Sequence, residues 1–197
     1  MASLLFAEKQ LAAGSIPSKH EAELRMFKAG AMLVLYNVVE ASARGGIEAI
    51  YDEMAVNQVT FDDLRPALKR RIVQDFKANF SASNSDRISL LAHQMISESF
   101  NAEKLFTGNV DAKLIRDKAA IFGFNADTDY DKTHHGSDLV VVKRKRNDLA
   151  HGVVSFSEVG RDYTARDLYR LGQRVTRYIE AILLQVDAYL DNGDYLG

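Results

Sequence analysis

The chain has 197 residues, a formal net charge of −2, 47% hydrophobic residues and no cysteine. The absence of cysteine excludes a disulfide framework and a thiolate zinc site and suits a reducing compartment, so we expect a cytoplasmic protein. The slightly negative charge excludes the overall positive field of a nonspecific nucleic-acid binder, so any nucleic-acid contact has to come from a local basic patch.

The length of the chain predicts one domain over residues 1–197. With only 2 prolines and 12 glycines, the composition favours long uninterrupted helices over many short strands. The N-terminal stretch from Met1 to Ala13 carries Glu8 and Lys9, so it does not have the pattern of a signal peptide. No apolar run reaches membrane-spanning length, and we expect no membrane contact.

The first predicted helix starts near Pro17, because Ser18 and Glu21 have the spacing of a capping box. An apolar series at helical spacing continues this helix to about Met54. The pair Gly45-Gly46 weakens the helix interior and favours a bend or a break there.

A basic amphipathic helix is predicted next, because Thr60 and Asp63 repeat the capping spacing before an apolar face that runs through Phe80. Its basic residues are Arg65, Lys69, Arg70 and Arg71. A polar stretch over residues 81–85 then breaks the chain, and a new apolar face predicts a helix over residues 86–100.

The second half of the chain predicts a short helix over residues 111–121 and a polar loop over residues 123–136. Ser137 or Asp138 then caps a helix that ends at Gly152, although Val140–Val142 is β-prone. The final helix, from Thr164 to about Leu190, has the clearest helical pattern. The predicted fold is an all-α, up-and-down helical bundle with long N- and C-terminal helices.

A basic run of Lys143, Arg144 and Lys145 leads into Arg146, and a histidine follows five positions later at His151. Histidine is the side chain that most readily takes up and releases a proton near neutral pH, and a guanidinium holds a phosphate oxygen in a fixed geometry. These two groups together suffice for RNA cleavage without a metal ion. The segment therefore predicts RNA chemistry.

The Arg/His spacing alone is a weak signal, because Arg144 with His151 and Arg87 with His93 fit it as well. We interpret His93 as a partly buried helix residue. His151 differs because Asn147, one helical turn before it, is placed to orient the imidazole.

Arg146 lies about 140° around an ideal helix from His151, so one straight helix would not direct both side chains to the same point. Either the helix ends at Gly152 and the imidazole swings back, or two subunits contribute their motifs to one composite site across a two-fold axis. The second arrangement, which we favour, places paired His and Arg side chains around one phosphate.

The motif Arg146-Asn147-Asp148-Leu149-Ala150-His151 resembles the Arg-polar-x-x-x-His signature of the HEPN superfamily (higher eukaryotes and prokaryotes nucleotide-binding). Further blocks are similar to a bacterial MAE-like HEPN family and occur in the expected order: Leu35–Ala41, Gly108–Val110, Phe122–Phe124 and Ser155–Thr164. The resemblance implies an α-helical bundle, a homodimer and, for many relatives, metal-independent endoribonuclease activity in toxin–antitoxin or phage-defence settings.

With this resemblance, we expect catalytic roles for Arg146, Asn147 and His151, RNA as the substrate, and a cognate antitoxin as a partner. His151 would take the proton of a ribose 2′-hydroxyl and a second His151 would protonate the leaving 5′-oxygen, which leaves a cyclic phosphate. Arg146 would stabilise the transition state, and Asn147 would hold the imidazole or a phosphate oxygen. Some HEPN toxins carry a modified tyrosine two positions after the histidine; here that position is Val153, so we do not expect this form of control.

Two sets of basic residues have two interpretations each. Arg166, Arg170, Arg174 and Arg177 fall within about 80° of one another on the last helix, where they either follow an RNA backbone or pair with acidic residues of neighbouring helices. The run Lys143–Lys145 either contacts phosphate or is a solvated face. The predicted RNA-binding residues are Lys143, Arg144, Lys145, Arg170 and Arg174.

The polar loop imitates the ligand spacing of a calcium loop with Asp127, Asp129, Asp131 and Asp138. The imitation is incomplete, because Lys132 stands where glycine is needed and Asp138 replaces the bidentate glutamate. The adjacent residues His134-His135 rarely converge on one ion without further ligands. No nucleotide-binding fingerprint is present, so we predict no metal and no cofactor.

Two other functions remain open at this point. The chain is alternatively a noncatalytic helical module that binds RNA, a nucleotide or a protein, which would be inert in cleavage but would bind its partner tightly. In a third interpretation it is a structural dimer in which Arg146 and His151 fasten the interface, and replacing either residue would then weaken the dimer.

Overall fold

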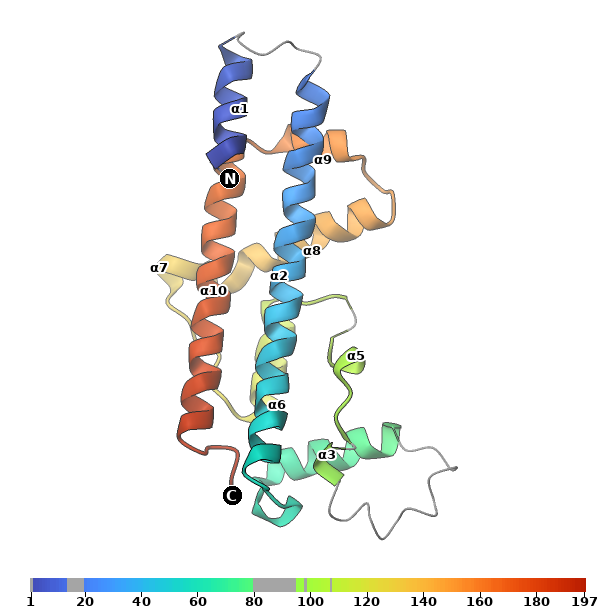
Figure 1. Ribbon diagram of the computed structural model, residues 1–197, viewed down its shortest axis with the longest axis vertical. Helices are drawn as coiled ribbons and strands as arrows, with labels where there is room; N and C mark the ends of the chain where they lie inside the picture. Colours follow the sequence, from blue (N-terminus) through green and yellow to red (C-terminus); the bar gives the residue numbers. More distant parts are fainter. Residues whose placement is uncertain (1, 14–19, 80–94, 98, 107) are drawn as a thin grey trace. The chain divides into compact units, whose positions relative to one another are not determined.

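The computed structural model describes every residue except 1, 14–19, 80–94, 98 and 107 (Figure 1). Its helices are α1 (Ala2–Ala12), α2 (Glu21–Val56), η2 (Phe61–Asp63), α3 (Pro66–Asn79), α5 (Ala102–Leu105), α6 (Ala112–Phe122), α7 (Tyr130–Thr133), η4 (His134–Gly136), α8 (Ser137–Ala150), α9 (Phe156–Asp162) and α10 (Ala165–Asp191), where η marks a 3-10 turn. The prediction of an all-α fold with two long helices is confirmed.

The chain forms two compact units, each of which has its own buried core. The first unit contains residues 1–40 and 128–179, and the second contains residues 41–127 and 180–197. Helices α2 and α10 contribute residues to both units, and α2 continues as a helix through Gly45-Gly46. The assignment of one domain to residues 1–197 stays a prediction.

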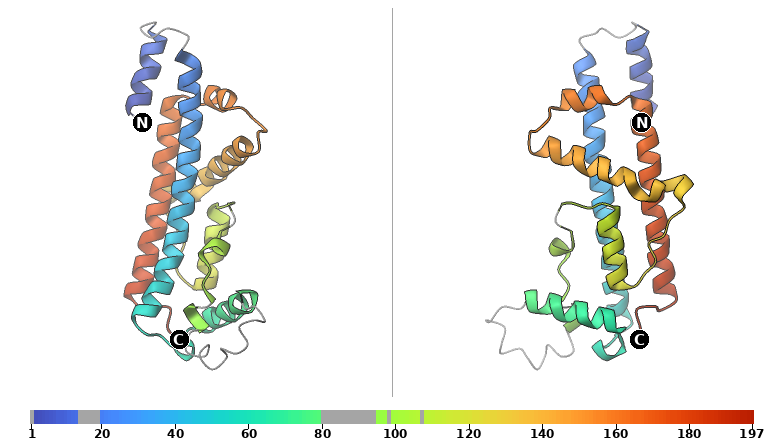
Figure 2. Two further views of the ribbon diagram at one scale, coloured as in Figure 1. Left: turned by 45° about the vertical axis from the view of Figure 1, so that its right-hand side comes forward. Right: turned by 180° about the vertical axis from the view of Figure 1, so that it is seen from behind.

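The first unit brings α8 across the first-unit halves of α2 and α10 (Figure 2). Its core consists of fully or almost fully buried side chains, among them Met32, Tyr36, Leu139, Val142, Val159, Leu168 and Val175. Helix α1, which the sequence analysis did not predict, joins this unit through one carboxylate. Glu8 lies 3.2 Å from the Lys28 ammonium and accepts a hydrogen bond of 2.9 Å from the backbone N–H of Ala165. It therefore satisfies an N-terminal N–H group of α10 that no helical carbonyl reaches.

Helix α9 was also missed, although its start carries a recognisable signal. Ser155 and Glu158 form a complete capping box, in which the Ser155 hydroxyl accepts from the backbone of Glu158 and the Glu158 carboxylate accepts from that of Ser155. Gly160 then lies so close to the backbone of Arg25 in α2 that an added Cβ atom would collide with it. The absence of a side chain at Gly160 thus allows α9 to dock on α2.

In the second unit, α3 begins at Pro66 and not at Thr60 as predicted. The capping box of Thr60 and Asp63 exists, but it closes the short turn η2, and the backbone is extended at Leu64 before the helix starts. Proline at the first helical position fits this start, because its missing N–H would have no helical partner there. Most of the helix predicted over residues 86–100 lies outside the described residues. Of its residues that are described, 95–97 and 99 are helical.

Helix α6 confirms the short helix predicted over residues 111–121, and it is capped at both ends. Asp111 accepts a hydrogen bond of 2.9 Å from the backbone of Leu114, and Gly123 ends the helix with a φ of 95°. The Tyr189 hydroxyl donates to the carbonyl of Phe122 at 2.6 Å, and burial raises the pKa of Tyr189 to about 12, which keeps this donor protonated. Within the described residues, no helix combines the length and the apolar character that a membrane crossing requires.

Candidate functional site

The start of α8 differs from the prediction that Ser137 or Asp138 caps it. Gly136 occupies the N-cap position in the left-handed region and supplies no side-chain cap. Asp138 is buried and instead accepts two hydrogen bonds from Arg174 of α10, at 2.5 Å from Nε and 3.0 Å from Nη2. This bond to the carboxylate raises the pKa of Arg174 above its ordinary value. The pair fixes the position of α8 on α10 within the first unit.

The residues just before α8 are more ordered than the predicted loop. They form the turns α7 and η4, in which His134 and His135 both take positive φ values near 50°. The ring of Tyr130 lies 5.7 Å from the ring of His134 and 5.3 Å from that of His135. These contacts and the glycine at position 136 turn the chain into α8.

Arg146, near the C-terminal end of α8, contacts Tyr36 and Asn147. Its guanidinium lies over the ring of Tyr36 from α2, with Cζ 4.8 Å from the ring centroid, and Nη1 donates to Oδ1 of Asn147 at 2.9 Å. Tyr36 is fully buried, whereas Arg146 is half-buried. A cation–π contact and a side-chain hydrogen bond therefore orient this guanidinium.

His151 lies one residue beyond the last helical residue and has the C-cap position. Its φ and ψ are −94° and 3°, its backbone N–H donates to the carbonyl of Asn147 at 2.9 Å, and the residue is exposed. Gly152 follows with a φ of 66°, so the predicted helix stop at this glycine is confirmed. The imidazole thus stands at an exposed helix end, one turn after the amide of Asn147.

The basic residues around the motif have different environments. The Arg144 side chain is 81% exposed, whereas Lys145 lies 5.8 Å from the ring centroid of Tyr163 and 3.4 Å from the Asp162 carboxylate. Lys143 is half-buried and Arg170 is exposed. For Arg174, the alternative interpretation, pairing with an acidic residue of a neighbouring helix, is confirmed by Asp138.

Two of the carboxylates that imitate a calcium loop, those of Asp129 and Asp138, are bound to other groups. Asp129 accepts from the backbone of Asp131 at 3.0 Å and pairs with Lys132 at 3.0 Å, and the hydrogen bond from Lys132 lowers the pKa of Asp129. Asp138 is bound to Arg174. Among the described residues, no three His, Asp or Glu side chains are grouped so as to hold a metal ion.

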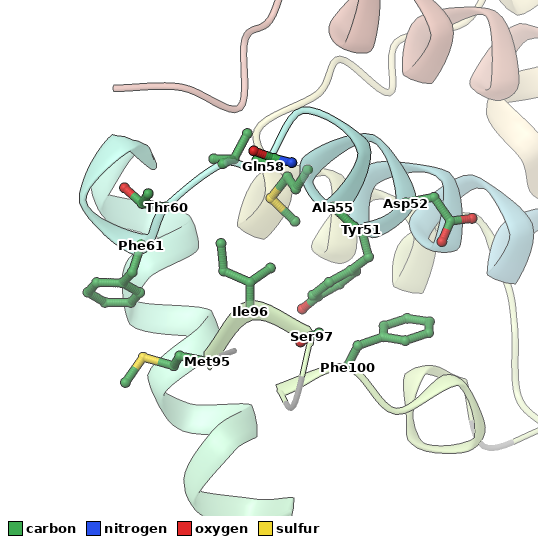
Figure 3. A pocket seen from close by; sticks show the side chains of 12 residues that line it. Tyr51, Asp52, Ala55, Gln58, Thr60, Phe61, Met95, Ile96, Ser97 and Phe100 are labelled. Atoms are coloured by element: carbon green, nitrogen blue, oxygen red, sulfur yellow. The ribbon is translucent and has the colours of Figure 1, made fainter. Parts of the chain in front are cut away.

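A hollow of about 610 Å³ lies in the second unit and contains none of the predicted site residues (Figure 3). Aromatic and aliphatic side chains dominate its lining, among them Tyr51, Phe61, Met95, Ile96 and Phe100. Burial raises the pKa of Tyr51, so its hydroxyl stays protonated at neutral pH. This hollow and the motif from Arg146 to His151 therefore lie in different units. We place the candidate site at α8, where side chains able to transfer protons and bind phosphate occur together.

Three residues near the motif were not singled out as functional by the sequence analysis: Tyr36 under Arg146, and Asp162 and Tyr163 beside Lys145. Each belongs to a block that carried the family resemblance, Leu35–Ala41 or Ser155–Thr164. A signal for them was therefore present, but only the structure assigns their contacts.

Comparison with known families gives one result that covers almost the whole chain. A family model described as MAE_28990-like HEPN matches residues 6–195. No curated protein and no solved structure matches the chain.

Proposed function

The chain belongs to the MAE_28990-like HEPN family, and from this premise we propose that it is a metal-independent endoribonuclease that cleaves RNA with Arg146 and His151. HEPN domains are often ribonucleases. The observation that carries the proposal is the difference between two environments at the end of α8. Tyr36 and Asn147 hold the guanidinium in place, whereas the imidazole is open to solvent. Phosphate binding needs a guanidinium that is held in place, and proton transfer to an external substrate needs an imidazole that is open to solvent.

The reaction is a transesterification within the RNA strand. His151 takes the proton from a ribose 2′-hydroxyl, whose oxygen forms a bond to the adjacent phosphorus, and the bond from phosphorus to the 5′-oxygen breaks. His151 of the partner subunit gives a proton to that leaving oxygen. The products are a 2′,3′-cyclic phosphate and a 5′-hydroxyl, and Arg146 stabilises the charge on the phosphoryl oxygens as the bonds change.

Asn147 has a positioning role in this scheme. Its amide oxygen accepts the hydrogen bond from Arg146, so the guanidinium is oriented before RNA arrives. Around the site, the exposed side chains of Arg144 and Arg170 are suited to contact the RNA backbone, with Lys143 and Lys145 in the same segment. Arg174 contributes chiefly by fixing α8 through Asp138.

A homodimer completes the site in this proposal. On α2, Phe27, Val34 and Val38 lie within about 40° of one another and are 69%, 63% and 46% exposed. Exposed apolar side chains in such a row favour a protein contact. Val140 and Val141 of α8 are also exposed, at 49% and 38%, in the same unit as the motif. We therefore assign the dimer contact to this face of the first unit.

Two substitutions test the dimer. Val34→Arg should give a monomer in sedimentation and abolish cleavage, because each monomer then lacks the second histidine. Leu184→Arg is the matched control, since Leu184 is similarly exposed, at 67%, but lies in the second unit. A dimer that survives Val34→Arg, or an active monomer, contradicts this assignment.

Mixing wild-type and His151→Ala chains tests the need for two histidines. If one site needs both, heterodimers are inactive and activity falls as the square of the wild-type fraction, to about a quarter at equal amounts. If each subunit acts alone, activity falls in proportion to that fraction. The proportional result removes the composite site but keeps the ribonuclease.

The biological setting that fits this activity is a cytoplasmic toxin or phage-defence component whose cleavage is held in check by a cognate antitoxin. Val153 is 70% exposed at the position where some HEPN toxins carry their modified tyrosine. Valine cannot carry that modification, so the proposed control is by a binding partner. An inert wild type that binds RNA, a nucleotide or a protein tightly would favour the noncatalytic module instead.

A further inference from the structure

Positive charge is concentrated on two helices of the second unit. Helix α3 carries four basic residues and one acidic residue, and α6 carries three basic residues and one acidic residue, a formal excess of five positive charges. The whole chain has a formal net charge of −2. Because α3 and α6 pack against each other, they form the kind of local basic patch that an otherwise acidic chain needs to attract a polyanion.

A hollow of about 310 Å³ lies on this patch. It is lined by small apolar side chains of both helices, Ala67, Ala120 and Ile121, and by the polar side chains of Arg70, Arg71 and Gln74 from α3. An apolar surface beside guanidinium groups matches a nucleotide, whose base and ribose need apolar contact and whose phosphate needs a cation.

The acidic residues of both helices are already engaged. Asp75 pairs with Arg71 at 2.5 Å, and Asp117 pairs with Lys113 at 3.2 Å. At the end of α6, Arg65 donates to the carbonyl of Gly123 at 3.2 Å, which offsets the negative end of the helix dipole beside the hollow. These bonds reduce the repulsion that an anion would meet there.

Lys118 of α6 supports the same conclusion. It is only 8% exposed, and its ammonium lies 5.8 Å from the ring centroid of Phe106. Burial lowers the pKa of Lys118, and the charge of Arg71 lowers it further. The charge of Asp75 raises the pKa of Lys118, but by less than the charge of Arg71 lowers it.

We propose that the hollow between α3 and α6 binds the sugar–phosphate backbone of a single-stranded RNA segment, as an anchor separate from the Arg146 and His151 motif. This inference rests on the proposed function in that RNA is the ligand. Arg70, Gln74 and Lys77 are exposed at positions i, i+4 and i+7, so they line one face of α3 over about 10 Å. A row of this length suits consecutive phosphates of a polymer better than one small anion.

The test measures RNA binding in the His151→Ala chain, which leaves the RNA uncut. A fluorescent single-stranded RNA is titrated with this chain and with the same chain carrying Arg70→Glu and Lys77→Glu. We expect affinity to fall at least about tenfold at low salt, and the salt slope to decrease by about 0.7 for each phosphate that the protein no longer neutralises. Arg70→Gln, which adds no negative charge, should reduce affinity less and in the same direction.

Lys132→Glu is the control, compared with Arg70→Glu and Lys77→Glu made singly, because it makes the same charge change as each of them at an exposed residue beside Asp129 and Asp131. If the α3 variants and the Lys132→Glu control have equal affinity for RNA and equal salt slopes, the proposed anchor is wrong.

Cleavage by chains that keep His151 separates the two proposals. If wild type cleaves RNA and the α3 variants bind normally, the anchor fails and the ribonuclease stands. If wild type does not cleave but the α3 variants lose RNA binding, the anchor stands and the ribonuclease fails.

Discussion

The guanidinium of Arg146 lies over the buried ring of Tyr36, with Cζ 4.8 Å from the ring centroid. This contact joins α8 to α2, because the two residues come from different helices of the first unit. It also means that the orientation of the arginine in the motif depends on a residue 110 positions earlier in the chain. Tyr36 is therefore a positioning residue for Arg146 in the proposed reaction.

Replacing Tyr36 tests this role. Tyr36→Leu should lower kcat by roughly ten- to thirtyfold, because a desolvated cation–π contact contributes about 2 kcal/mol. Tyr36→Phe keeps the ring and should cleave at nearly the wild-type rate. The rates are measured at saturating RNA, and the fraction of folded protein is determined for each variant. Equal kcat values for the two folded variants would contradict the role.

The pair of Asp138 and Arg174 should act on stability. Arg174→Gln should lower the free energy of unfolding by about 1.5–3 kcal/mol, because it removes hydrogen bonds to a buried charged group. Arg170→Gln, on the exposed side of the same helix, should weaken RNA binding and leave stability unchanged. A double-mutant cycle with Asp138→Asn and denaturant unfolding measures the coupling. No coupling between the two sites would contradict the structural role.

Gly160 offers a test of how α9 docks. Gly160→Ala should destabilise the protein by about 1–3 kcal/mol, because the new methyl group meets the backbone of Arg25. Gly172→Ala is the control in α10, where a Cβ atom has no neighbour within 4 Å. There the substitution should stabilise by about 0.5–1 kcal/mol. Thermal unfolding measures the stability of both variants. Equal stability of Gly160→Ala and Gly172→Ala would show that α9 does not dock as described.

The capping carboxylates predict a pH dependence of stability. Hydrogen bonds from Ser155 lower the pKa of Glu158, and those from Thr164 lower the pKa of Asp167. Since the folded pKa lies below the unfolded value, this stabilisation is complete above the ordinary carboxyl pKa and is lost as the pH falls through the folded value. The difference in unfolding free energy between wild type and Glu158→Gln should therefore shrink on acidification. A difference that stays constant down to the lowest pH would contradict this mechanism.

Helix periodicity and capping signals predicted much of the fold. Glu21 is the first residue of α2, the pair of Thr164 and Asp167 stands where α10 begins, and Gly152 stands where α8 stops. The errors are local. At Thr60 the same signal closes a 3-10 turn, because the extended backbone at Leu64 ends it before Pro66 starts α3.

The site could be predicted only in part, for a physical reason. The motif from Arg146 to His151 is local in sequence, so its residue types and spacing are visible there. The partners Tyr36 for Arg146, Asp138 for Arg174 and Asp162 for Lys145 are set by tertiary packing. Helical periodicity does not predict which acidic or aromatic side chain contacts which cation.

The cleavage assay tests the central claim most directly. A mixed RNA pool is incubated in EDTA with the wild-type chain, with Arg146→Ala and with His151→Ala, and the product ends are analysed beside an RNA that carries a single 2′-deoxy position. We expect 2′,3′-cyclic phosphate ends from the wild type alone, and no cut after the 2′-deoxy residue, because the attacking hydroxyl is missing. Cleavage by His151→Ala at the wild-type rate, or normal cleavage after the 2′-deoxy residue, would contradict the proposed ribonuclease.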